Sequence, residues 1–179
     1  TVHYGGRPAK GLYFSGERAG VPTQVFTHAQ CADARAWFPC FDEPHDRATS
    51  EIVVRVPRAW SVLSGGERLE RREEGDQAVE RWRTTFPHPP YLMSLVAGEL
   101  TIEESQWEGV PLWFAAEPRL APELAETFAE TDEILAFLTA VTGVRYPYAK
   151  YSQAAVDGFP YGGMENMSAT TVTDSAVTD

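Results

Sequence analysis

Residues 122–142 are the one stretch of this 179-residue chain with a strong helical periodicity. The apolar stripe that predicts the helix consists of Leu124, Phe128, Leu135, Leu138 and Val141. Pro122 suits the first helical turn, and Gly143 suits the position just beyond the last one. A chain of this length that offers a single helix must build most of its core from strands.

Strand-like segments precede this helix. Residues 51–56 are rich in β-branched side chains and end at Pro57, and residues 78–86 alternate apolar with charged side chains, as a half-exposed strand does. The charged segment 67–76 between them is interpreted as a solvated hairpin or loop. Residues 91–100 form a continuous apolar run, which predicts a strand buried on both faces.

Further strands are predicted around the helix, at residues 110–115, 152–156 and 168–173, and the last two flank a glycine-rich loop. The pattern changes near residue 108, where an all-β part gives way to a part with alternating strand and helix. We therefore predict a mainly β chain with an α/β portion, divided into residues 1–108 and 109–179.

The composition excludes several classes of function. The net charge is −11, from 26 acidic and 15 basic residues, which argues against nucleic acid because phosphate binding needs clustered Lys and Arg. An acidic surface suits a cationic ligand, and it also simply keeps a protein soluble. The longest apolar runs are too short to span a bilayer, and no signal-peptide pattern opens the chain.

The two cysteines, Cys31 and Cys40, are too few for a disulfide framework or a metal knuckle. A bond between them stays open, but buried free thiols in a cytoplasmic protein are the favoured interpretation. Because the chain begins at Thr1 and not at methionine, we also expect its natural start to lie upstream.

The glycine-rich loop is the segment most suggestive of chemistry. Gly162 and Gly163 allow an extended ligand to approach the backbone closely. The carboxylate of Glu165 follows them and can accept hydrogen bonds from a cationic amine at the end of such a ligand. An ordinary surface turn followed by an acid would look the same, so the residues alone leave both interpretations open.

A resemblance to a known family decides between them. Residues 162–166, GGMEN, resemble the G-x-M-E-N exopeptidase motif of the aminopeptidase N family of zinc metallopeptidases, which are gluzincins. With residues 159–161, FPY, before it, the Gly-Gly form is most similar to the leukotriene-hydrolase-like branch. Residues 24–30, QVFTHAQ, and 33–44, DARAWFPCFDEP, resemble a second family segment. Two shorter matches, GLY at 11–13 and YLMS at 91–94, follow the family's order.

This resemblance implies a fold and a cofactor. Residues 1–108 would be the later part of a saddle-like antiparallel β-domain, and residues 109–179 would open a thermolysin-like catalytic domain. The family holds zinc through an H-E-x-x-H motif and a downstream Glu. No such motif occurs between residues 1 and 179, and none of the four histidines lies four residues from another. We expect the zinc site to follow the chain and the segment alone to be inactive.

The resemblance also implies roles for individual residues. Glu165 would bind the free α-amino group of the substrate, and Gly162 and Gly163 would line the edge along which the peptide lies. Gln30 would face the same amine, since an amide oxygen can also accept from an ammonium. Tyr161 would wall the pocket for the first side chain.

The other residues assigned to the substrate-binding site are Met164, Asn166 and His28. His28 stands where the family commonly has Gln. It either lines the specificity pocket and makes it pH-sensitive, or it is a loop histidine with no part in catalysis. The neighbouring Arg35, Asp42 and Glu43 are interpreted as architectural.

The predicted function is that of a substrate-binding segment of a zinc aminopeptidase, which hydrolyses N-terminal residues from peptides with a free amine. The alternative is a catalytically inactive family member that serves as a peptide-binding or assembly module. A natural short protein that is no peptidase is a third reading, and the half-built second part argues against it, because the helix would expose an apolar face.

Overall fold

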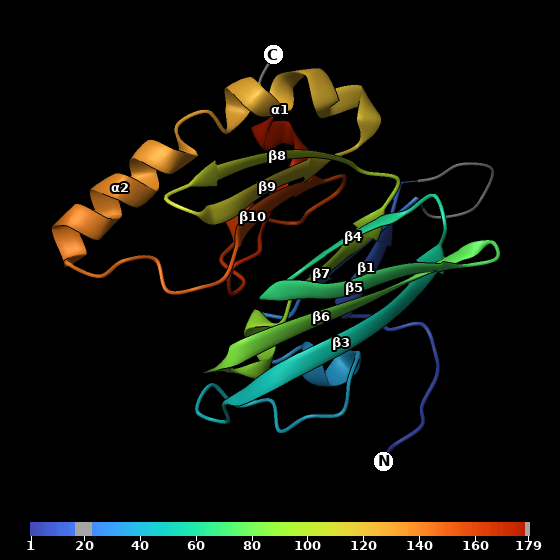
Figure 1. Cartoon of the computed structure of the whole chain (residues 1–179). Coiled ribbons are helices and arrows are strands. Elements are labelled where there is room, and N and C mark those ends of the chain that lie inside the picture. The colour runs from blue at the N-terminus through green and yellow to red at the C-terminus, as the bar shows by residue number, and fades with distance from the viewer. Residues whose placement is uncertain (17–22, 178–179) are drawn as a thin grey trace.

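The computed structural model describes residues 1–16 and 23–177, which form three β-sheets and two α-helices (Figure 1). The first sheet is antiparallel, and its strands in spatial order are β1 (Gly11–Ser15), β2 (Gln24–His28), β7 (Leu95–Gly98) and β4 (Ser61–Ser64). The predicted mainly β architecture with a small helical part is confirmed.

The second sheet is antiparallel, and its strands in spatial order are β3 (Ala48–Pro57), β6 (Gln77–His88) and β5 (Glu67–Glu74). The predicted strands at 51–56 and 78–86 are confirmed, and both are longer than expected. The charged segment 67–76, interpreted as a solvated hairpin or loop, forms β5 and the turn of its hairpin with β6, and most of its side chains are exposed. Cross-strand ion pairs, such as Arg83 with Glu67 at 2.9 Å, follow this exposed face.

The third sheet has five strands and mixed direction. In spatial order they are β11 (Gly163–Met164), β12 (Thr170–Thr173), β10 (Tyr151–Val156), β9 (Val110–Ala116) and β8 (Thr101–Trp107). The three central strands are parallel, and each edge strand is antiparallel to its neighbour. Residues 108 and 109 form the turn between β8 and β9, so β8 belongs to the same sheet as the later strands. The division of the chain into two domains near residue 108 stays a prediction.

The single predicted helix is wrong, because two helices occupy its place: α1 (Ala121–Thr127) and α2 (Thr131–Thr142). The backbone leaves the helical conformation at Phe128, whose ring stacks on Phe114 of β9 with centroids 4.9 Å apart. Leu124 and Leu135 are buried as predicted, but Leu138 and Val141 are 49% and 67% exposed. The apolar stripe therefore faces the sheet only over its first part.

The predicted ends of the helical region are confirmed. Pro122 lies in the first turn of α1, and Gly143 follows α2 with a φ of 68°, a left-handed conformation that glycine adopts without steric cost. Short 3₁₀ helices complete the described elements, at Ala34–Ala36, Pro90–Leu92, Pro118–Leu120 and Asp174–Ala176.

The apolar run 91–100 is only partly a strand. β7 covers Leu95–Gly98, lies between β2 and β4 and is buried throughout, as predicted. Residues 91–94 do not belong to it, because Pro90 opens a 3₁₀ turn and cannot donate to a sheet.

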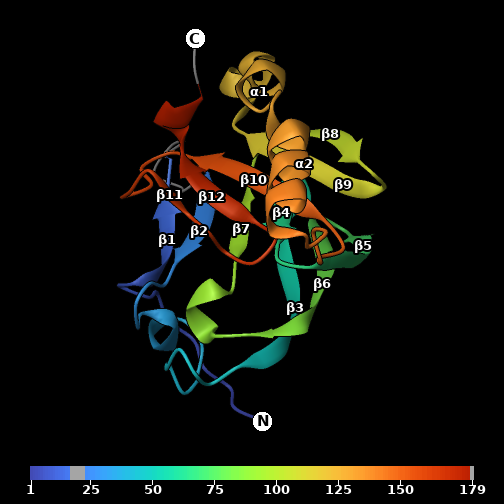
Figure 2. The ribbon, with the colours of Figure 1, turned by 90° about the vertical axis from the view of Figure 1, so that its left-hand side faces the viewer.

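The main core lies between the first and third sheets, with the third sheet above the first in both views (Figures 1 and 2). Phe26, Leu63 and Val96 come from the first sheet, and Ala154 and Val156 from β10. Two further members, Phe159 and Met164, come from the glycine-rich loop, so that loop is part of the core. Helices α1 and α2 cover the opposite face of the third sheet (Figure 1).

Both cysteines are free thiols, as favoured, but neither is buried: Cys31 is exposed and Cys40 half-buried. Among residues 1–16 and 23–177, no helix is long and apolar enough to cross a bilayer.

Candidate functional site

The glycine pair forms one edge of the five-stranded sheet. The amide of Thr173 donates to the carbonyl oxygen of Gly162 at 3.2 Å, and Gly163 lies opposite Val172. Hydrogen-bonded and non-bonded pairs alternate along an antiparallel ladder. The N–H and C=O of Gly163 therefore point away from β12, and within the described residues no strand pairs with that side of β11.

Glu165 follows directly and is exposed, while its neighbours on both sides are buried. Met164 is 1% exposed and belongs to the main core. Asn166 is 3% exposed, and its side-chain amide donates to the carbonyl oxygen of Met93 at 3.4 Å. The carboxylate is thus presented to solvent from a backbone that is anchored on either side.

Hydrogen bonds also anchor the segment after Asn166 to neighbouring parts of the structure. The Met167 amide donates to the carbonyl oxygen of Leu92 at 3.3 Å, and the Gly66 amide donates to Oγ of Ser168 at 2.7 Å. Ser168 has a φ of 61°, which is unusual for a residue other than glycine. These bonds tie the loop to the turn between β4 and β5 and to the segment before β7.

Aromatic rings form the wall beside Glu165. The imidazole of His28, at the end of β2, stacks on the ring of Tyr161 with centroids 4.7 Å apart. The ring of Phe159 meets His28 edge-on at 5.5 Å and packs against Phe26 at 5.4 Å. Tyr161 is 61% exposed and forms the outer surface of the group.

His28 is 6% exposed, and burial lowers its pKa below the ordinary value. The carboxylates of Asp33 and Glu165 act in the opposite direction and partly raise the pKa, which shows that Glu165 lies within electrostatic reach of the ring. His28 therefore lies in a strand end that contacts the loop, and not in an isolated turn.

Of the predicted site residues, His28 stacks on Tyr161 and lies within electrostatic reach of Glu165, and Gly162 and Gly163 lie at the edge of the sheet just before Glu165. Gln30 lies two residues past His28 in an exposed turn, and its peptide bond to Cys31 is cis. Within the described residues, no hydrogen bond joins Gln30 to the group.

The architectural interpretation of the 33–44 segment agrees with its contacts. The buried carboxylate of Asp42 accepts from the backbone amide of Arg35 at 3.0 Å, and the Arg35 guanidinium donates to the Asp42 carbonyl at 3.2 Å. Glu43 is exposed. Arg35 and Asp42 therefore close the loop that follows β2.

Two residues near the site carried no functional interpretation in the sequence. Phe159 belongs to the loop and packs in the main core against Phe26 of β2, and Gln24 is fully buried on β2. Gln24 and Phe26 share a strand face with His28, and this period of two was the available signal.

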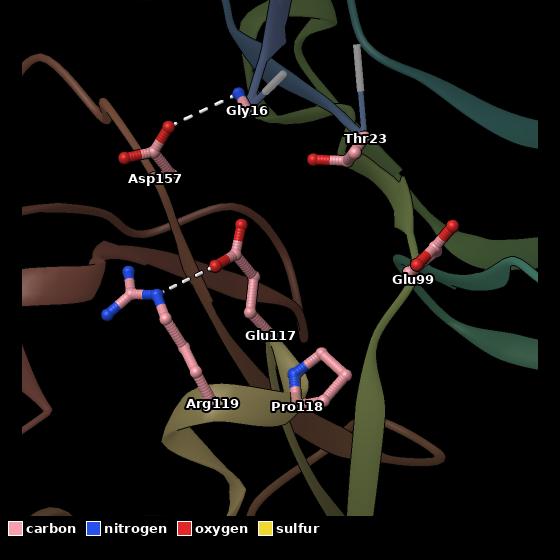
Figure 3. A pocket seen from close by; sticks show the side chains of 7 residues that line it. All are labelled: Gly16, Thr23, Glu99, Glu117, Pro118, Arg119 and Asp157. Carbon is pink, nitrogen blue, oxygen red and sulfur yellow. Dashed lines mark hydrogen bonds and ion pairs between the residues drawn. The ribbon is translucent and has the colours of Figure 1, made fainter. Parts of the chain in front are cut away.

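A pocket of about 490 Å³ lies at the carboxyl ends of β9 and β10 (Figure 3). It is lined by Gly16, Thr23, Glu99, Glu117, Pro118, Arg119 and Asp157. Asp157 accepts from the Gly16 amide at 3.2 Å, and Glu117 pairs with Arg119 at 2.9 Å. The carboxylates of Asp157 and Glu117 therefore serve structural contacts.

Over residues 1–16 and 23–177, no group of three or more His, Cys, Asp or Glu side chains could hold a metal ion. The described residues thus do not fit a zinc site of their own.

Comparison with known proteins gives the family. Residues 1–92 match the model of the peptidase M1 N-terminal domain. Aminopeptidase N of Acetobacter pasteurianus is 26% identical over 99% of this chain, leukotriene A-4 hydrolase of Xenopus laevis is 30% identical over 86%, and aminopeptidase N of Oryctolagus cuniculus is 33% identical over 84%. The chain spans 56%, 25% and 16% of these relatives' lengths. Because the family model matches just over half of its residues, the chain belongs to the peptidase M1 family.

Proposed function

We propose that this chain is the substrate-binding segment of a zinc-dependent aminopeptidase that removes N-terminal residues from peptides. The observation that carries the proposal is the position of the exposed Glu165 carboxylate. It follows the edge at Gly163, which pairs with no other strand of the described residues on its outer side, and it lies within electrostatic reach of His28, whose ring stacks on Tyr161.

The proposed binding mode follows from these groups. An extended peptide adds to the edge of β11 and exchanges backbone hydrogen bonds with Gly163. Its terminal ammonium donates to Glu165 in a charge-assisted bond, which is stronger than a neutral one. A carboxylate at this point limits how far the peptide can advance, so a single residue lies beyond the bond to be cleaved. The first side chain then rests on the exposed ring of Tyr161.

Gln30 has a secondary role in this proposal. Its exposed turn begins two residues past His28, and in this proposal its amide oxygen accepts from the same ammonium. Because a neutral amide accepts more weakly than a carboxylate, Gln30 would support the binding that Glu165 dominates.

Zinc belongs to the proposal only for the full-length enzyme. The described residues hold no group that could bind a metal. We therefore assign no step to zinc on this segment, and we propose that the metal ligands come from residues outside it. By the same reasoning, the segment alone should bind peptides without cleaving them.

The experiment compares the full-length enzyme with its Glu165→Gln variant on a substrate with a free amine and on the same substrate after N-acetylation. We expect kcat/KM for the free amine to fall at least about tenfold, since a charge-assisted bond is replaced by a neutral one. Glu104→Gln, which neutralises an exposed acid on β8, is the matched control and should leave the kinetics unchanged. Unchanged kinetics in Glu165→Gln would refute the anchoring role. A protein that binds free-amine peptides through Glu165 without cleaving them would instead be a binding module.

A further inference from the structure

Alternate residues of β2 contact alternate residues of the loop that leads to Glu165. Gln24 bonds to Asp157, Phe26 packs on Phe159, and His28 stacks on Tyr161. Side chains two apart on a strand point to the same face, so these three contacts form one ladder along β2. The loop 157–161 therefore lies on β2 in a definite register.

The two ring contacts, Phe26 with Phe159 and His28 with Tyr161, cannot set this register alone. Ring contacts are apolar and tolerate sliding, because offset and edge-to-face arrangements are similarly favourable. A hydrogen bond between buried polar groups is directional and costly to leave unmade. The third contact, made by Gln24, is a hydrogen bond of this kind, and Gln24 is 0% exposed.

Both ends of the Gln24 side chain are engaged. Its carbonyl oxygen, Oε1, accepts from the backbone amide of Asp157 at 3.0 Å. Its Nε2 donates to Oε1 of Glu117 at 2.5 Å. A flipped amide would place a donor against the Asp157 N–H and an acceptor against the carboxylate, so only one orientation satisfies both partners.

These partners occupy equivalent places in the sheet. Glu117 directly follows β9, and Asp157 directly follows the neighbouring parallel strand β10. Figure 3 shows both side chains, with the Asp157 carboxylate also accepting from Gly16 at 3.2 Å. Gln24 thus connects the first sheet to the carboxyl ends of two strands of the third, at the point where the loop begins.

We propose that Gln24 is a positioning residue: it fixes the register of loop 157–161 on β2 and so places Tyr161 and the Gly162–Gly163 edge relative to Glu165 for substrate binding. This inference rests on the proposed function. When Gln24 can no longer bond, the start of the loop is released, and Tyr161 and the glycine edge shift relative to Glu165, which stays anchored through its neighbours Met164 and Asn166. Because Glu165 acts on the bound ground state, the effect falls on KM and not on kcat.

The experiment uses four variants of the full-length enzyme. Gln24→Leu removes both hydrogen bonds at similar volume. Gln24→Glu keeps an acceptor for Asp157 but places a carboxylate against Glu117. The double variant Gln24→Glu with Glu117→Gln exchanges the two groups and restores both bonds. Gln153→Leu is the matched control. Gln153 lies on β10, away from β2, and this variant removes only its side-chain hydrogen bond to Thr131 at 3.4 Å.

Two measurements are made on each variant: KM and kcat for a free-amine substrate, and amide hydrogen exchange of residues 158–162. We expect KM to rise about tenfold in Gln24→Leu and further in Gln24→Glu, with kcat within about twofold of the wild type, since a misaligned charge-assisted bond weakens binding of the substrate ground state. Loop exchange should accelerate in both. The exchanged pair should restore both readouts, and Gln153→Leu should change neither.

The outcomes separate the two proposals. Faster loop exchange that the exchanged pair reverses supports the register role even if Glu165→Gln shows that the amine is not bound there. A lowered thermal stability with unchanged KM and unchanged loop exchange would mean that Gln24 is only a core residue, and it would overturn the inference. Failure of the exchanged pair to restore the loop would overturn it as well.

Discussion

The imidazole of His28 stacks on the ring of Tyr161 with centroids 4.7 Å apart and planes inclined by 28°. This contact joins the end of β2 to the loop before the GGMEN motif. It places a titratable ring within electrostatic reach of Glu165, the proposed amine anchor. Three consequences of the structure around this site can be measured.

The first prediction concerns how KM for the substrate changes as the pH falls below 7. Burial lowers the pKa of His28, so the ring is neutral near pH 7 and takes up a proton only below its ordinary value of about 6.5. A cationic His28 would repel the substrate ammonium beside Glu165, so KM should rise as the pH falls from 7 to about 5.5.

The measurement is KM against pH in the full-length enzyme and in His28→Gln, with the two compared at each pH so that titration of the substrate cancels. The ratio of wild-type to variant KM should increase by about threefold or more at the acid end, as repulsion between close charges predicts. A ratio that stays constant would show that His28 does not face the amine.

The second prediction concerns Lys150, which is 3% exposed. Its ammonium donates to Ser152 Oγ at 2.8 Å and to the Ser168 carbonyl at 3.0 Å, and it lies over the Trp82 ring. Burial lowers its pKa to about 7, from an ordinary value near 10.5. Between these values the unfolded chain binds more protons than the folded one, so stability should rise with pH through this window.

The upper bound of this gain is about 5 kcal/mol, because each unit of pKa shift corresponds to about 1.4 kcal/mol. Denaturant unfolding between pH 7 and pH 9 should show the rise in the wild type and a much smaller slope in Lys150→Met. Parallel stability curves for the two proteins would mean that Lys150 stays charged in the folded state.

The third prediction separates two properties of Ser168. Its Oγ accepts from the Gly66 amide, and its backbone is left-handed. Ser168→Ala loses the bond and keeps the strained backbone, and should cost about 1–3 kcal/mol of unfolding free energy. Ser168→Gly loses the same bond but relieves about 1 kcal/mol of strain, so it should be the milder change.

Both variants are measured by denaturant unfolding, with the exposed Ser105→Ala on β8 as the control. If alanine proves milder than glycine, the left-handed backbone carries no cost and the explanation fails.

Much of the fold follows from local patterns. The strands at 51–56 and 78–86 and the helix boundaries at Pro122 and Gly143 were predicted correctly, because periodicity and capping depend on neighbours in the chain. The break in the helix at Phe128 was missed, because the contact that stabilises it, the stacking of its ring on Phe114, involves strand β9, which precedes the helices in the chain. Leu138 and Val141 were misassigned for a related reason: a stripe shows which face is apolar, and not how far the sheet beneath it extends.

The same distinction applies to the site. By itself, the sequence determined the family motif and the paired glycines followed by an acid, because a motif is a property of a short segment. The strand β2, which carries Gln24, Phe26 and His28, was not predicted. Only the tertiary structure decided that these alternate residues of β2 meet Asp157, Phe159 and Tyr161. The physical reason is that contacts between segments far apart in the chain depend on how two sheets pack around a shared core, which no local pattern encodes.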